Sequence, residues 1–150
     1  MTKSMIAFAI VASVIGGMLT ATQGPTNAML ARPLNSPVNA AFVSFAIGTA
    51  VLLVLVAVLR IKPDLQGAAA LPWYAWMGGV YGVGFVCAAA FSAPRLGVAT
   101  TITLMVAGQL IIGMILDHFG AFGIEPRPIS FGRVAGIALV AVGVLLVRRT

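Results

Sequence analysis

The sequence predicts an all-α integral membrane protein, and three observations indicate this fold class. Apolar residues make up 61% of the 150-residue chain, and charged residues make up only 8%. Soluble domains carry about 25% charged residues, and the mean hydropathy of +1.10 lies far on the apolar side. The apolar residues also gather in long runs, each near the ~20 residues that a helix needs to cross a lipid bilayer. We therefore expect a single transmembrane domain over residues 1–150 with five transmembrane helices.

Short polar segments separate the five predicted spans. Arg32 and Pro33 end the first run, and a loop with Pro63 follows the second, because proline cannot continue a helix interior. Trp73 and Trp76 open the third run with side chains that favour the membrane–water boundary. The spans cover approximately residues 5–30, 38–59, 72–92, 98–116 and 129–147.

The first span carries the strongest candidate binding site. Its small and polar residues at spacings of three and four, which share one helix face, are Ser13, Gly16, Thr20, Gln23 and Asn27. Polar groups in hydrocarbon are costly unless they face protein or a wet cavity. We therefore interpret Ser13, Thr20, Gln23 and Asn27 as substrate-binding residues that recognise a small solute through hydrogen bonds. The alternative is hydrogen bonding between helices, worth about 0.6 to 2 kcal/mol per bond.

Gly24 and Pro25 lie within the same stretch and predict a helix break. Pro25 has no N–H to donate to the carbonyl of Ala21, and Gly24 loosens the same turn. Freed backbone groups persist at membrane depth only where they line a cavity or find protein partners. The break is therefore expected to expose backbone groups or to bend during transport.

The fourth span offers Gln109 as a further substrate-binding candidate. Thr101 and Thr103 lie in the same span, but threonine hydroxyls often bond back to their own helix. Gln109 is therefore expected to support the first-span residues, with a purely structural role as the alternative.

Asp117 and His118 form an acid–imidazole pair where the fourth span ends, and they are candidates for a proton relay. The alternative is that both residues are simply interfacial. Arg133 begins the fifth span, where its long side chain is expected to reach the lipid headgroups; the alternative is that it holds an anionic solute.

Several function classes are disfavoured by what the sequence lacks. One histidine beside one aspartate does not make a metal site, which needs three or four ligands. The chain shows no nucleophile motif or phosphate-binding loop, so we expect no enzyme, no catalytic residue and no cofactor. The basic residues lie at the ends of apolar segments and not in a patch with aromatic residues, so nucleic acid is not an expected partner.

The basic residues are almost evenly divided between the two sides of the membrane. Five spans put one group, Lys3, Arg60, Lys62, Arg127 and Arg133, opposite the other, Arg32, Arg95, Arg148 and Arg149. Orientation normally follows a clear excess of Lys and Arg on the cytoplasmic side. We therefore predict dual topology, with an antiparallel ten-helix homodimer that resembles the inverted repeats of larger transporters. The alternative is that one or two of these charges outweigh the rest and set a single orientation.

Four segments resemble a known family over essentially the whole chain. They are Gln23-Gly24-Pro25 with Asn27, Asn39 to Gly48, Leu96-Gly97-Val98-Ala99, and Gly108-Gln109-Leu110 leading to Asp117-His118-Phe119-Gly120. Together they are similar to the YdcZ family of small bacterial inner-membrane proteins, within the drug/metabolite transporter (DMT) superfamily. The resemblance implies a five-helix protein of the inner (plasma) membrane, in a family whose members occur as dual-topology proteins, opposed pairs or fused ten-helix chains. It supplies no substrate.

A more distant resemblance links the chain to the small multidrug resistance proteins. The first span lacks the acidic residue of those proteins, which argues against export of cationic drugs. The expected function is transport of a small solute by alternating access. A channel or passive pore lined by amides and threonines, and a structural subunit that requires a partner, are the alternatives.

Overall fold

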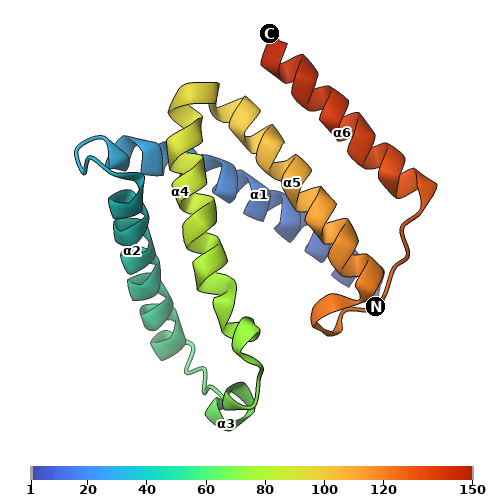
Figure 1. The fold of residues 1–150 in the computed structure, drawn as a ribbon. Coiled ribbons are helices and arrows are strands. Elements are labelled where there is room, and N and C mark those ends of the chain that lie inside the picture. Colours follow the sequence, from blue (N-terminus) through green and yellow to red (C-terminus); the bar gives the residue numbers. More distant parts are fainter. Residues whose placement is uncertain (1, 150) are drawn as a thin grey trace. The chain divides into compact units, whose positions relative to one another are not determined.

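The computed structural model describes residues 2–149, and all the regular structure in that range is helical (Figure 1). The helices in chain order are α1 (Lys3–Ala31), α2 (Pro37–Val58), α3 (Leu65–Ala69), the 3₁₀ turn η1 (Trp73–Met77), α4 (Gly78–Leu96), α5 (Val98–Phe119), the 3₁₀ turn η2 (Ala121–Gly123) and α6 (Phe131–Arg149). The all-helical prediction is confirmed for these residues.

Within residues 2–149, four segments are long and apolar enough to cross a membrane: Lys3–Ala31, Pro37–Val58, Trp73–Leu96 and Val98–Phe119. They correspond to the first four predicted spans. The fifth coincides with α6, whose apolar part, Phe131–Val147, is shorter. Many large apolar side chains face outward, as Phe8 on α1 (76% exposed) and Phe131 on α6 (90% exposed) illustrate. Apolar surface of this extent is typical of helices that face lipid.

The helices form two compact units, one ending at Pro94 and the other beginning at Arg95. In the first unit α1 packs against α2. The turn between them suits its sequence, because the Ser36 hydroxyl accepts hydrogen bonds from the N–H groups of Val38 (3.1 Å) and Asn39 (3.4 Å) and so caps α2. Pro37, at the first helical position, needs no N–H partner there.

Small residues let α4 approach both α1 and α2 within this unit. A Cβ atom added at Gly24 of α1 would lie 3.5 Å from the Cβ of Ala89, and one added at Gly82 would lie 3.0 Å from Cζ of Phe45 on α2. The buried residues of the three helices are mostly small: Gly24, Asn27, Ala28, Ala40, Ala41, Val86, Ala89, Ala90 and Ala93. Close backbone approach through small residues is how membrane helices gain packing energy without a hydrophobic driving force.

The third predicted span ends later than expected. We predicted an end at residue 92, but α4 continues through Pro94 to Leu96. Proline within a membrane helix removes one backbone hydrogen bond without necessarily ending the helix. Gly97, with φ of 81°, alone separates α4 from α5.

In the second unit α5 packs against α6. Gly120 ends α5 in the left-handed conformation (φ 59°), and its N–H donates to the carbonyl of Asp117 at 3.3 Å. A Cβ atom at this position would lie 2.7 Å from Cγ of Pro126 and 2.9 Å from the carbonyl oxygen of Ile124. A side chain at this position would therefore strain the turn back toward α6.

Replacing Gly120 with alanine is expected to lower the free energy of unfolding by about 2 kcal/mol, from left-handed backbone strain and overpacking. Unfolding in mixed micelles with increasing dodecyl sulfate would measure it. Gly143→Ala is the matched control, because no atom outside its own stretch of α6 lies within 4 Å of the added Cβ. Equal stability of the two variants would contradict the prediction.

Candidate functional site

The predicted polar stripe on α1 is divided between exposed and buried residues. The hydroxyls of Ser13 and Thr20 are exposed and donate to the carbonyls of Ala9 and Gly16, both at 2.8 Å. Gln23 is half-buried, and Asn27 is only 4% exposed. The structure therefore buries only the C-terminal end of the stripe, and Ser13 and Thr20 satisfy their own hydrogen bonds within α1. Binding of a solute by these four residues stays a prediction.

Asn27 is the unusual member of this group. Its amide nitrogen Nδ2 is buried and has no hydrogen-bond partner among the described residues. A buried polar group left without a partner costs about 1–3 kcal/mol. Buried polar atoms are rarely unpartnered in native proteins, so each such case requires an explanation. A ligand that accepts a hydrogen bond is one such explanation for Asn27.

The helix break expected at Gly24 and Pro25 is absent, because α1 continues without interruption from Lys3 to Ala31. The expectation was therefore wrong for the helix geometry in this structure. The Thr26 hydroxyl lies within bonding distance of the carbonyls of Thr22 (3.1 Å) and Gln23 (2.9 Å) in the same turn. Threonine hydroxyls can satisfy carbonyls near a proline in a membrane helix, which helps the helix tolerate it.

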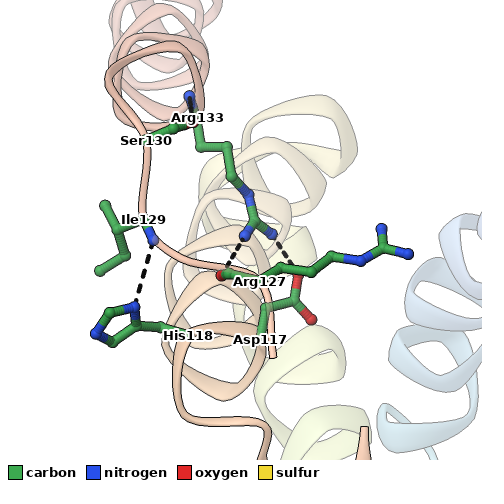
Figure 2. A network of polar contacts seen from close by, with 6 residues as sticks. All are labelled: Asp117, His118, Arg127, Ile129, Ser130 and Arg133. Atoms are coloured by element: carbon green, nitrogen blue, oxygen red, sulfur yellow. Dashed lines mark hydrogen bonds and ion pairs between the residues drawn. The ribbon is translucent and has the colours of Figure 1, made fainter. Parts of the chain in front are cut away.

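A second polar group lies where α5 and α6 meet, and Figure 2 shows it. Nη2 of Arg133, near the start of α6, forms an ion pair with Oδ2 of Asp117 in the last turn of α5. Nη1 of the same guanidinium donates to the carbonyl of Arg127 at 3.0 Å. The N–H of Arg127 in turn donates to the carbonyl of Asp117 at 2.7 Å. This network ties the connecting loop and both helix ends together.

Arg133 was expected to extend to the headgroups, and the structure gives its guanidinium a protein partner in Asp117. The loop returns α6 alongside α5, which brings a carboxylate and a guanidinium together across sixteen residues. An ion pair between two charges at the membrane boundary avoids leaving either of them without a partner. The two side chains remain 34% and 30% exposed for Arg133 and Asp117, respectively, so another molecule can reach them.

Asp117 and His118 have separate partners (Figure 2). Nδ1 of His118 accepts a hydrogen bond from the N–H of Ile129 at 3.3 Å, and its ring meets the Phe119 ring edge-on with centroids 4.9 Å apart. Asp117 faces Arg133 instead. These contacts support a structural role for His118 in holding the loop. A relay through the pair stays a prediction.

A cavity of about 500 Å³ lies between α5 and α6. It is lined by Gln109, Leu110, Gly113, Met114, Asp117, Arg133, Gly136 and Ile137. Gln109, Gly113 and Asp117 follow one another at four-residue steps and therefore share one face of α5. Gln109 and Asp117 were both candidates from the sequence, but their common cavity with Arg133 was not foreseen. The four-residue spacing was the available signal.

Two threonine hydroxyls of the fourth predicted span bond within their own helix. The hydroxyls of Thr101 and Thr103 donate to the carbonyls of Gly97 (2.8 Å) and Ala99 (2.7 Å), which confirms that they bond to their own helix. Within residues 2–149, the structure gathers no three His, Cys, Asp or Glu side chains that could hold a metal ion.

Comparison with known proteins identifies the family. A model of the family described as "Putative inner membrane exporter, YdcZ" matches residues 8–146. The protein named Inner membrane protein YdcZ, from Escherichia coli (strain K12), is 32% identical over 136 residues, which cover 88% of this chain and 83% of that protein. No solved structure matches the chain. The apolar helices, the matched length and this identity confirm the resemblance seen in the sequence: the chain belongs to the YdcZ family of multi-pass inner-membrane proteins, within the drug/metabolite transporter type.

Proposed function

We propose that the protein exports a small solute across the inner membrane by alternating access, as an antiparallel homodimer of dual topology. The family description as an exporter supports the transporter class and the outward direction. It also agrees with the expectation that the protein is not an enzyme.

The buried amide of Asn27 is the observation that carries this proposal. An amide at membrane depth that lacks a partner lowers stability, and natural proteins tolerate such groups mainly at functional sites. A solute with a hydrogen-bond acceptor would supply the missing partner of Nδ2. Half-buried Gln23 lies one helical turn away and would add a second amide to the same site.

Gly24 and Pro25 fit alternating access even though α1 is continuous. The turn lacks the hydrogen bond that residue 25 would otherwise donate to the carbonyl of Ala21. That turn is therefore the place where α1 bends most easily. Because Gly24 lies close to Ala89, such a bend would displace the part of α4 that contacts it.

The proposal of a dual-topology dimer rests on the even division of basic residues between the two sides of the membrane and on the small number of helices in one protomer. In the described part of the chain, four segments meet the length and composition of a membrane span, and the apolar part of α6 is shorter. Five helices, the count that α6 completes, are few for enclosing a solute pathway. Two copies in opposite orientations would give ten helices related by a two-fold axis in the membrane plane, with a solute site at the repeat interface.

Labelling of the C-terminus tests the topology directly. In a Cys87→Ala background, a single cysteine at residue 150 is expected to react from outside the cell in about half of the molecules, because the charge bias is close to zero. A membrane-impermeant thiol reagent on intact cells, compared with the same cells after permeabilisation, would measure this fraction.

A charge-shifted variant provides the matched control. Gln66→Lys with Ala69→Lys adds two positive charges to exposed positions of α3, on the side that already holds five. This variant is expected to insert in a single orientation, with its C-terminus reacting almost fully from outside. If the unmodified chain already reacts fully or not at all, one orientation is set and the homodimer proposal fails.

A further inference from the structure

The cavity between α5 and α6 combines an ion pair with apolar walls. Its volume of about 500 Å³ lies within the 300–1,000 Å³ that is typical of small-molecule sites. Asp117 and Arg133 lie along one part of the lining, while Leu110, Met114 and Ile137 provide the apolar part. Such a site can recognise a charged group and a hydrocarbon group in the same molecule.

Both members of the ion pair have hydrogen-bonding capacity to spare. A guanidinium has five N–H donors, and Arg133 uses its side chain on Asp117 and on the carbonyl of Arg127. The carboxylate of Asp117 makes its ion pair through Oδ2, so Oδ1 keeps its lone pairs for another donor. Because both side chains are about one-third exposed, a ligand can reach each charge.

The charge of the ligand follows from the need of both Asp117 and Arg133 for a counter-charge. A singly charged ligand that took one partner would leave the other without a counter-charge at the edge of the membrane, which is unfavourable. A zwitterion presents an ammonium to Asp117 and an anionic group to Arg133, so neither charge loses its partner. The site remains electrically neutral after binding.

The apolar part of the lining indicates which side group the ligand carries. Gly113 and Gly136 have no side chain. No atom outside their own helix stretches lies within 4 Å of a Cβ atom built at either position, so space remains beside the ion pair. Leu110, Met114 and Ile137 would cover a hydrocarbon group held there. We infer that this cavity binds a small zwitterion with an apolar side group, such as an α-amino acid with a branched or aromatic side chain.

This inference goes beyond the proposed function, because it concerns binding by α5 and α6 and requires neither transport nor a dimer. A purified protein that binds the zwitterion but carries nothing would retain the inference and refute the proposed function. Transport of a solute, together with no protection of the cavity by L-leucine, L-methionine or L-phenylalanine, would refute the inference and retain the proposed function.

Protection of a cysteine placed in the cavity tests the inference. In the Cys87→Ala background, Met114→Cys places a thiol on the lining, and N-ethylmaleimide labels it in purified protein reconstituted in nanodiscs. L-leucine is expected to slow this labelling about tenfold at saturation, because a bound ligand would shield the thiol from the reagent. Two analogues that retain its hydrocarbon group, 3-methylbutylamine (ammonium only) and 4-methylpentanoate (carboxylate only), are expected to protect at least about tenfold less well at equal concentration, a difference of ~1.4 kcal/mol.

A variant then tests the contribution of the Arg133 charge. Arg133→Gln is expected to abolish protection by L-leucine. Arg127→Gln is the matched control and should retain it, because Arg127 contributes its backbone carbonyl to the network and its side chain is not part of the lining. Equal protection by either single-charge analogue would overturn the inference. So would the absence of protection by L-leucine, L-methionine and L-phenylalanine alike, a result expected if lipid or a neighbouring helix fills the cavity.

Discussion

Replacing Asn27 with leucine is expected to make the protein more stable and to abolish its transport. Leucine is close to asparagine in shape, so it removes the unpartnered amide without leaving a large cavity. Removal of a buried group whose lack of a partner costs about 1–3 kcal/mol should raise the free energy of unfolding by a similar amount. If a solute is the missing partner, export should fall at least about tenfold, which corresponds to ~1.4 kcal/mol.

The opposite changes in stability and activity distinguish a binding residue from a structural one. If Asn27 served to join helices, its replacement would lower the free energy of unfolding. Replacement of a residue kept only for function raises the free energy of unfolding. Unfolding in mixed micelles gives the first quantity, and accumulation of labelled solutes in cells with and without the protein gives the second.

Thr22→Val is the matched control for this replacement. Its hydroxyl is exposed and donates to the carbonyl of Met18 on the same helix at 2.9 Å, so little change is expected in either measurement. Retained export by an Asn27→Leu protein that dimerises normally would remove Asn27 from the site.

Single replacements in the ion pair between α5 and α6 are expected to destabilise the protein more than their combination does. Removing one partner of a fully buried pair costs about 3–5 kcal/mol. Exposure of about one-third of each side chain reduces this to about 1–3 kcal/mol for Arg133→Leu, which leaves the Asp117 carboxylate unpaired. Asp117→Leu should cost less, because a freed Arg133 can extend to the headgroups.

The double variant Asp117→Leu with Arg133→Leu should recover most of this loss, because two apolar side chains can replace an ion pair with little net change. A double-mutant cycle by micelle unfolding would measure the coupling energy between the two residues. Glu125→Gln removes an exposed charge from the same loop and should alter stability by less than about 0.5 kcal/mol. Additive effects of the two leucine replacements would show that the pair does not stabilise the fold.

The sequence predicts the helices of this protein well, because each boundary depends on neighbouring residues. Hydrocarbon requires that backbone groups bond within their own segment, so long apolar runs become helices. Ser36 and Pro37 start α2 where a cap and a first-turn proline favour it. Errors arose where proline was read as a breaker, since α1 and α4 both continue through one.

Only the tertiary structure decided which polar residues have partners. Spacing placed Ser13 and Asn27 on one face of α1, but exposure separates them. Among the side chains that the structure describes, only the Asn27 amide is buried without a partner. Helices that are apolar nearly all round do not reveal which face meets protein and which meets lipid. The pairing of Arg133 with Asp117, and the cavity beside it, depend on how the loop returns α6 to α5. A contact between residues so far apart in the chain is set by packing, which local sequence patterns do not encode.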